Sequence, residues 1–208
     1  MVASYTQLLA KRYQGKLDAA ADDYIKFAVD GAKKMQQLII DLLTYGQVGK
    51  QGYKFRTISS EAALSAALQN LAAAIRESEA VIRSGPLPPV WADPTQLERL
   101  FRNLLGNAVK FRRSRQPEIH VSGEESDAEW HFWVADNGIG IDPQHADRIF
   151  QLFQQLHTRE EYPGTGIGLP ICRKIAERHG GRIWVESQPG HGATFHFTIS
   201  KSGSGAPR

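Results

Sequence analysis

Three short segments constrain this 208-residue chain more than any other feature. Residues 136–140 read D-N-G-I-G and end an apolar run, and residues 164–169 read G-T-G-I-G-L. Residues 103–111, N-L-L-G-N-A-V-K-F, come before both and have the pattern of an amphipathic helix. Singly, each has an ordinary interpretation as a turn, a glycine-rich loop or a polar helix face. Their order and spacing predict one shared site instead.

The first glycine segment places a carboxylate beside a tight turn. Asp136 follows a strand-like run, and a carboxylate there can accept a hydrogen bond from a ring amine such as adenine N6. Such a bond in a dry pocket discriminates against bases that lack the donor. Gly138 and Gly140 would let the backbone approach a flat ring closely. The segment therefore predicts recognition of adenine.

The second glycine segment precedes a predicted helix. Free backbone N–H groups, together with the positive end of a helix, make a cradle for phosphate. Gly164, Gly166 and Gly168 supply the backbone freedom, and Pro170 suits a first helical turn. The segment lacks the GK[ST] ending of a P-loop and the GxGxxG of a Rossmann turn, so neither of those motifs is present.

The helix of residues 103–111 carries Asn103, Asn107 and Lys110 at positions i, i+4 and i+7, which lie on one face. Amide oxygens are suitable ligands for Mg²⁺ and leave room for phosphate oxygens and water. A lysine can neutralise charge that develops on a phosphoryl group. This face therefore predicts contact with Mg²⁺ and phosphate.

The first part of the chain predicts a helical hairpin. A helix over residues 1–13 is followed by a break, and Asp18 is a suitable N-cap for a second helix. The second helix carries apolar residues spaced 3, 4, 3, 4 and 3 apart, which is a heptad seam. Its apolar face is too wide for one partner helix, so we expect a four-helix bundle made by two chains; packing of the helix on its own globular domain is the alternative. The seam comprises Ile25, Ala28, Ala32, Met35, Ile39 and Leu42.

The rest of the chain alternates between helical and strand patterns. We expect an α+β protein: a hairpin over residues 1–48, a linker over 49–53, an α/β sandwich of a mixed sheet packed on helices over 54–200, and a disordered tail over 201–208. Predicted helices start at Ser59 or Ser60 (to about residue 77), at Asp93 as N-cap (to about 111), and span 143–153 and 170–179. Predicted strands span 54–58, 80–83, 90–92, 118–123, 130–135, 182–187 and 193–199.

Composition excludes several classes. The net charge is +3, with no dense Lys/Arg stripe interleaved with aromatic residues, so we expect no nucleic-acid partner. Cys172 is the only cysteine, which rules out an intrachain disulfide and fits a reducing compartment. No apolar stretch has the length of a membrane span. We therefore expect a cytoplasmic location.

The motifs together resemble the catalytic, ATP-binding domain of sensor histidine kinases, a relative of the gyrase, HSP90 and MutL ATPase domains. Residues 103–111 resemble the N box, 136–140 the first G box, 149–153 the F box, 164–169 the second G box and 190–195 the last G box. The sequences of residues 91–93, 153–157 and 178–184 are similar to those of the phytochrome-like branch.

The resemblance implies the cofactors ATP and Mg²⁺ and a role for each motif. Asp136 would read adenine with help from Thr194 through water, Asn107 would hold Mg²⁺, and an ATP lid would span about 154–168. Arg159 would be a lid cation, and a solvated loop arginine is the alternative. The implied ATP-binding residues are Asn103, Asn107, Lys110, Asp136, Gly138, Gly140, Ile141, Arg159, Gly164, Thr165, Gly166, Ile167, Gly168, Leu169 and Thr194.

A histidine kinase also uses a phosphoacceptor histidine in its first bundle helix. None of the seven histidines falls within residues 1–48, so we expect the chain to begin after that position and not to phosphorylate itself. The resemblance implies transfer of the γ-phosphoryl group to a histidine and then to a response-regulator aspartate. It also implies a homodimer through the hairpin and an upstream sensory domain. The alternatives are a related ATPase, disfavoured because Asn103 stands where those enzymes place a glutamate base, and a dimerising scaffold that binds ATP without catalysis.

Overall fold

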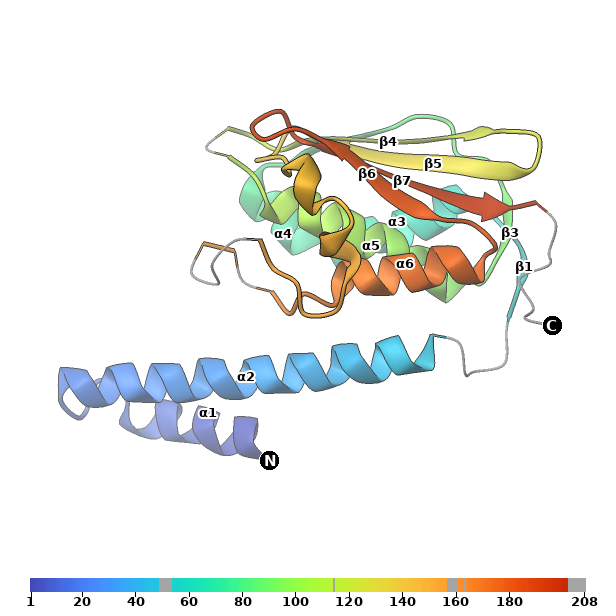
Figure 1. The fold of residues 1–208 in the computed structure, drawn as a ribbon. Coiled ribbons are helices and arrows are strands. Elements are labelled where there is room, and N and C mark those ends of the chain that lie inside the picture. The colour runs from blue at the N-terminus through green and yellow to red at the C-terminus, as the bar shows by residue number, and fades with distance from the viewer. Residues whose placement is uncertain (49–53, 114, 157–160, 163, 202–208) are drawn as a thin grey trace. The chain divides into compact units, whose positions relative to one another are not determined.

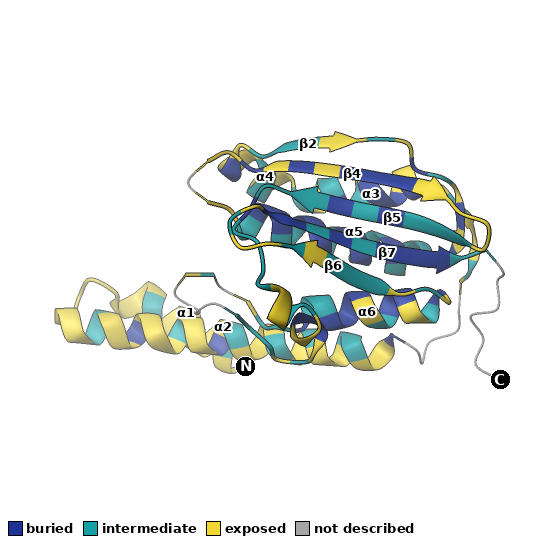
Figure 2. Cartoon of the chain, turned by 45° about the horizontal axis from the view of Figure 1, so that its top comes forward, coloured by how far each residue is buried: buried dark blue, intermediate teal, exposed yellow. Residues whose placement is uncertain are grey.

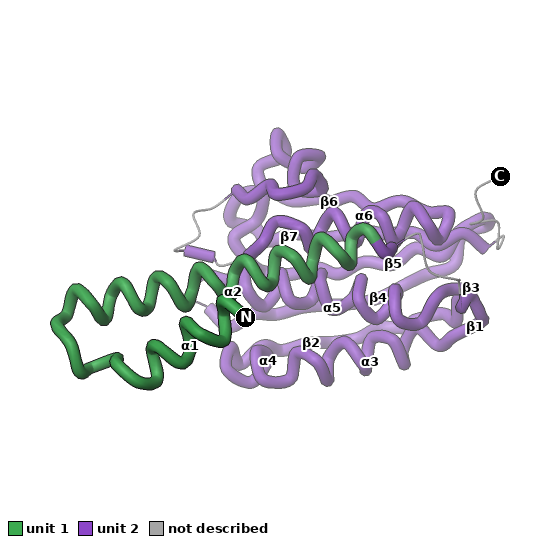
Figure 3. The backbone as a smooth tube through the Cα atoms, turned by 90° about the horizontal axis from the view of Figure 1, so that it is seen from below, with its two compact units in different colours: residues 1–46 green, residues 47–208 purple. Residues whose placement is uncertain are grey.

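The structure is a computed structural model that describes residues 1–48, 54–113, 115–156, 161–162 and 164–201. It divides into two compact units, Met1–Gly46 and Gln47–Arg208 (Figure 3). The boundary falls two residues before the predicted end of the hairpin. The predicted linker and Arg159 lie outside the described residues, as does the predicted tail apart from its first residue. That residue, Lys201, donates its backbone N–H to the carbonyl oxygen of Ala128 at 3.0 Å.

The first unit is a hairpin of two helices, α1 (Val2–Tyr13) and α2 (Ala19–Gln47). Asp18 caps α2 as predicted, because its Oδ1 accepts the N–H of Ala21 at 2.7 Å. The much longer α2 has only two buried residues, Ile25 and Ala32. Farther along the seam, Met35, Ile39 and Leu42 are 54%, 59% and 49% exposed. The second half of the seam therefore has no cover within this unit.

The second unit is a five-stranded mixed sheet with helices on one face (Figure 1). The strand order is β2-β4-β5-β7-β6, with β2 parallel to β4 and every other neighbour antiparallel. Helices α3, α4, α5 and α6 all lie on the same side of it, and the two buried positions of β5, Phe132 and Val134, alternate with less buried ones (Figure 2). This matches the predicted sandwich of sheet on helices. The elements are β1 (Arg56–Ile58), α3 (Ser60–Asn70), α4 (Ala72–Ser78), β2 (Val81–Ser84), β3 (Val90–Ala92), α5 (Pro94–Lys110), β4 (Glu118–Glu125), β5 (Glu129–Asp136), two 3-10 turns η1 (Pro143–His145) and η2 (Arg148–Phe150), α6 (Gly168–Arg178), β6 (Ile183–Ser187) and β7 (Ala193–Ser200).

Helix α5 forms the centre of the core. Phe101 of α5 is fully buried and meets Phe132 of β5 and Phe197 of β7 edge-on, with ring centroids 6.2 and 5.6 Å away. The two strand phenylalanines stack on each other at 4.9 Å. Such aromatic contacts add to the free energy of burial. They hold α5, and with it the predicted polar face, in one orientation against the sheet.

The start of α5 is fixed by hydrogen bonds. At its start, the Oδ1 of Asp93 accepts the N–H groups of Thr95 and Gln96, with proline at the first position, as predicted. The backbone N–H of Asp93 itself donates to Nε2 of His179 at 3.2 Å. His179 lies at the end of α6, and its Nδ1 faces the carbonyl oxygen of Ile175 at 2.8 Å. The imidazole therefore ties the end of α6 to the start of α5.

Two predicted helices differ from the structure. The helix predicted from Ser59 to residue 77 breaks at Leu71, whose φ of −102° and ψ of 5° end α3 and begin α4. The break lets both shorter helices pack against α5. The helix predicted over 143–153 is instead two 3-10 turns, η1 and η2. Phe153 adopts a φ of +64°, a left-handed conformation that a helix does not continue through.

Candidate nucleotide-binding site

Asp136 is the last residue of β5, and its carboxylate is held by the backbone. Its Oδ1 accepts the N–H of Gly138 at 2.8 Å and the N–H of Ala193, opposite it on β7, at 3.2 Å. Within the described part of the chain, Oδ2 accepts no hydrogen bond. Burial raises the pKa of the carboxyl group, and the two backbone N–H groups oppose that rise. The side chain is thus fixed through one oxygen and can offer the other to a ligand.

The turn after Asp136 packs against the end of α5. The N–H of Ile139 donates to the carbonyl oxygen of Phe111 at 3.0 Å. A Cβ at Gly138 would lie 2.4 Å from the same oxygen, so only glycine fits there. Asn137 connects this turn to the start of β4, because its Oδ1 accepts the N–H of Glu118 at 3.0 Å. The first glycine segment is therefore joined directly to the asparagine-bearing helix.

The loop between β6 and β7 closes over the same turn. Gly140 has a φ of +73°, and a Cβ there would lie 2.0 Å from the carbonyl oxygen of Gln188. Gly192 has a φ of +84°, and its Cβ would lie 1.9 Å from the carbonyl oxygen of Asp136. The hydroxyl of Ser187 accepts the N–H of Ile141 at 2.8 Å and donates to the carbonyl oxygen of Gly192 at 2.6 Å. Ser187 thereby links the first and last glycine segments.

The polar face of α5 meets the second glycine segment. Nδ2 of Asn103 donates to the carbonyl oxygen of Gly168 at 3.2 Å. Nζ of Lys110 lies 3.9 Å from the centre of the Phe111 ring. A Cβ at Gly164 would lie 3.1 Å from the same Nζ. Burial lowers the pKa of Lys110 from 10.5 to about 8. Asn107 is half-buried between them on the same face, and its side chain makes no hydrogen bond to a described residue.

The second glycine segment is anchored on both sides. The N–H of Phe153 donates to the carbonyl oxygen of Gly166 at 3.0 Å, and Nε2 of Gln155 donates to that of Gly164 at 2.8 Å. Gly166 has a φ of +71°, and a Cβ there would meet the backbone of residues 153 and 154 within 3.1 Å. Helix α6 begins at Gly168, two residues before the predicted start, so the segment leads into the helix N-terminus. Ile167 is fully buried beneath it.

The structure brings most of the predicted residues together. The hydrogen bonds and close approaches described join three parts: the polar residues of α5, the turn after β5 and the loop before α6. The backbone of Ile141 belongs to the turn after β5. Thr165 and Leu169 are half-buried in the loop and the first turn of α6. Arg159 lies outside the described residues.

Thr194 needs a correction. In the antiparallel register Asp136 lies opposite Ala193, whereas Thr194 lies opposite Ala135. Side chains alternate along a strand, so Thr194 points to the other face of the sheet from Asp136. The prediction that Thr194 assists Asp136 through water is therefore wrong. The backbone N–H of Ala193 is the group from β7 that reaches the carboxylate.

Sequence reasoning missed Asn137, Ser187 and Phe111 as supports of this site. Asn137 could have been suspected because asparagine commonly hydrogen-bonds backbone near a turn. Ser187 and Phe111 carry no local signal, because their partners are 46 and 28 positions away in the sequence.

Comparison with known proteins identifies the family. Residues 92–203 match the family model described as "Histidine kinase-, DNA gyrase B-, and HSP90-like ATPase". The chain belongs to this family. The predicted fold class is thereby confirmed. In addition, no helix among the described residues has the length and hydropathy of a membrane span.

The curated relatives include cyanobacterial phytochromes. Cyanobacterial phytochrome A of a Nostoc species is 56% identical over 202 residues, covering 97% of this chain and 26% of that protein. Phytochrome-like protein Cph1 of a Synechocystis species is 49% identical over 198 residues, covering 95% and 26%. The chain spans about a quarter of the length of these relatives. The predicted resemblance to the phytochrome-like branch is confirmed.

A solved structure is also similar over nearly the whole chain. The crystal structure of full-length ShkA in complex with AMPPNP has a TM-score of 0.72 and 25% identity, and covers 99% of this chain and 44% of that one.

Proposed function

We propose that this chain is the ATP-binding catalytic region of a sensor histidine kinase. The reaction is transfer of the γ-phosphoryl group of ATP to a histidine and then to an aspartate of a response-regulator receiver domain. The observation that carries the proposal is Asp136, a carboxylate fixed at the end of β5 by two backbone N–H groups with its second oxygen available to a ligand. An adenine amine is a donor that suits such an acceptor, and guanine presents a carbonyl oxygen at the equivalent position.

The phosphates would lie between α5 and the second glycine segment. Lys110 and Asn103 would line this space from α5, and the backbone of residues 164–168 would line it from the loop before α6, because Gly164 lies beside the Lys110 ammonium and Asn103 donates to Gly168. The amide oxygen of Asn107 suits Mg²⁺, because this ion is usually held by few protein ligands together with phosphate oxygens and water. When bound, the ion would neutralise phosphate charge. The described residues contain no cluster of three His, Cys, Asp or Glu side chains that would compete for a metal.

The phosphoacceptor would be a histidine absent from this chain, because histidine kinases place it in the first bundle helix and none of the seven histidines lies within residues 1–48. A chain of this kind would receive its signal from a sensory region upstream, as the name phytochrome suggests for its relatives. With no phosphoacceptor in the hairpin, the chain by itself would bind nucleotide without phosphorylating its own hairpin.

The hairpin would dimerise. The uncovered half of the α2 seam exposes large apolar side chains, including Met35, Ile39 and Leu42, and exposed contiguous apolar surface marks an interface. A second copy of the hairpin would cover it as a four-helix bundle. In this assignment residues 1–48 are the dimerisation hairpin, 49–53 the linker, 54–200 the catalytic domain and 201–208 a tail.

Calorimetric titration tests the nucleotide site. Wild-type protein is titrated with AMPPNP and with a GTP analogue, each with and without Mg²⁺, alongside the Asp136→Asn and Asn107→Ala variants. We expect Mg²⁺-dependent binding selective for adenine, loss of binding in Asp136→Asn, and loss of the Mg²⁺ dependence in Asn107→Ala. A folded wild-type chain that binds neither nucleotide would overturn the proposal. Full Mg²⁺-dependent affinity in Asn107→Ala would overturn the metal assignment and favour a scaffold.

A further inference from the structure

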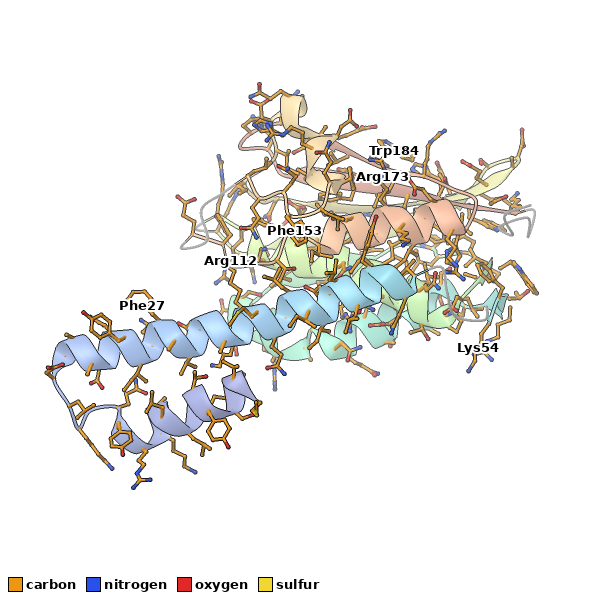
Figure 4. All side chains as sticks on the ribbon, turned by 60° about the horizontal axis from the view of Figure 1, so that its bottom comes forward. Phe27, Lys54, Arg112, Phe153, Arg173 and Trp184 are labelled. Carbon is orange, nitrogen blue, oxygen red and sulfur yellow. The ribbon has the colours of Figure 1, made fainter. Side chains whose placement is uncertain are left out.

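Phe111 and Arg112 follow directly after the last turn of α5, and their backbone joins three parts of the site. The N–H of Phe111 donates to the carbonyl oxygen of Asn107 at 2.8 Å, which closes the helix. Its own carbonyl oxygen accepts the N–H of Ile139 from the turn after Asp136. Arg112, labelled in Figure 4, turns its carbonyl oxygen toward the segment that precedes the second glycine loop. These two residues therefore connect the adenine side of the site with the phosphate side.

The contact on the phosphate side is made by Tyr162. Its hydroxyl donates to the carbonyl oxygen of Arg112 at 3.1 Å. Its ring lies against the ring of Phe111, with centroids 5.0 Å apart and an interplanar angle of 42°. Tyr162 is two residues before Gly164, and it is half-buried although it belongs to a loop. One side chain thus makes both a polar and an aromatic contact with the end of α5.

The ring of Phe111 is shared between Tyr162 and Lys110. The ammonium of Lys110 sits 3.9 Å from the centre of that ring, which is a cation–π distance. Gly164 passes so close to this ammonium that a Cβ there would lie 3.1 Å from it. The position of Gly164 beside the lysine therefore depends on the contacts that hold this segment: Gln155, which donates to the carbonyl oxygen of Gly164, and Tyr162, two residues ahead of it.

We propose that Tyr162 is a positioning residue that fastens the second glycine segment to the end of α5 and so sets the distance between its backbone and Lys110. The inference rests on the proposed function and adds a residue to it. Tyr162 contacts the ring of Phe111 and the carbonyl oxygen of Arg112, whereas the turn after Asp136 is held by the backbone carbonyl oxygen of Phe111. Removal of Tyr162 should therefore weaken the hold on phosphates and leave the hold on adenosine unchanged. A side chain needed only for folding would weaken both alike.

The first test needs no ligand. Hydrogen exchange of the backbone amide of Phe153, which donates to the carbonyl oxygen of Gly166, is compared between the wild type, Tyr162→Phe and Tyr162→Ala. Tyr162→Phe keeps the ring contact and loses the hydroxyl, whereas Tyr162→Ala loses both. We expect exchange of this amide to be about tenfold faster in Tyr162→Ala and to rise less in Tyr162→Phe, with exchange in β5 unchanged. Equal exchange in all three proteins would overturn the inference whether or not the chain binds ATP.

The second test separates phosphate from base. Affinity for AMPPNP with Mg²⁺ and affinity for adenosine are measured on the same variants. We expect Tyr162→Ala to bind AMPPNP about tenfold more weakly and adenosine within about twofold of the wild type, with Tyr162→Phe in between. Parallel losses for both ligands would reduce Tyr162 to a folding contact and refute the positioning role. Failure of the wild type to bind either ligand would refute the proposed function instead, and the exchange experiment would still decide the role of Tyr162.

Discussion

Lys110 offers the sharpest test of how this site works, because burial places its titration near neutral pH. Its pKa is lowered from 10.5 to about 8. About nine-tenths of the ammonium groups are then charged at pH 7 and about one-tenth at pH 9. A bound triphosphate would stabilise the charged form, so binding above pH 8 must be accompanied by uptake of a proton. Affinity should therefore fall as the pH rises through 8.

The size of this effect follows from the charged fraction alone. If only charged Lys110 binds the phosphates, the apparent affinity for AMPPNP falls about tenfold between pH 7 and pH 9. A lysine with its ordinary pKa of 10.5 would stay charged over this range and the affinity would scarcely change. The Lys110→Met variant should bind weakly at both values, and Lys110→Arg should bind without the decline because arginine keeps its charge. Titration of the nucleotide itself affects all three proteins equally.

Calorimetry in two buffers of different ionisation enthalpy measures the proton uptake directly. At pH 9 we expect close to one proton taken up per AMPPNP bound by the wild type and none by Lys110→Arg beyond the contribution of the ligand. Identical pH profiles for the wild type and the arginine variant would refute the reasoning, because the low pKa of Lys110 would then have no link to phosphate binding. The unliganded protein should show the opposite trend: unfolding takes up a proton between pH 8 and 10.5, so Lys110 makes the fold more stable as the pH rises.

The remaining predictions concern base recognition, backbone and the α5–α6 connection. Asp136→Asn should keep the fold, because an amide oxygen can still accept the two backbone N–H groups. The variant should bind ATP about 2–4 kcal/mol more weakly in calorimetry, because the charged acceptor is lost. Gly140→Ala should lower the free energy of unfolding by at least about 2 kcal/mol in urea titration, because its φ is +73° and the new Cβ would meet a carbonyl oxygen at 2.0 Å. Gly106→Ala is the matched control in the same unit, because its Cβ meets nothing closer than 3.8 Å. Its free energy of unfolding should rise by about 0.5–1 kcal/mol, since alanine is favoured over glycine inside a helix. Equal losses in both variants would contradict the steric argument. His179→Leu should cost about 1–3 kcal/mol, because the N–H of Asp93 loses its acceptor. Burial lowers the pKa of His179 below 6.5, so the wild type should lose stability as the pH falls from about 6.5 toward that lowered pKa. A His179→Leu variant with unchanged acid sensitivity would contradict this assignment.

Local hydrogen bonds made much of this fold predictable. Asp18 and Asp93 cap helices through N–H groups two or three residues away, so the sequence alone contains both partners. The strand pair β4 and β5 follows from alternation and a short connection. By contrast, the break at Leu71 comes where α3 and α4 both pack on α5, and the left-handed Phe153 donates its N–H to the carbonyl oxygen of Gly166; these partners lie farther along the chain and leave no local signal.

The sequence by itself determined the chemistry available at this site: an acceptor at Asp136, amides and an ammonium on one helix face, and glycines where the backbone must turn. Those features depend on residue type and on the helical repeat, both of which are local. Tertiary structure alone decided which groups meet. The register of β5 and β7 turns Thr194 away from Asp136, burial in the folded domain lowers the pKa of Lys110, and Tyr162 reaches Arg112 across 50 positions of sequence. Such contacts follow from strand order and helix packing, because segments far apart in the chain are brought side by side only by the shared core.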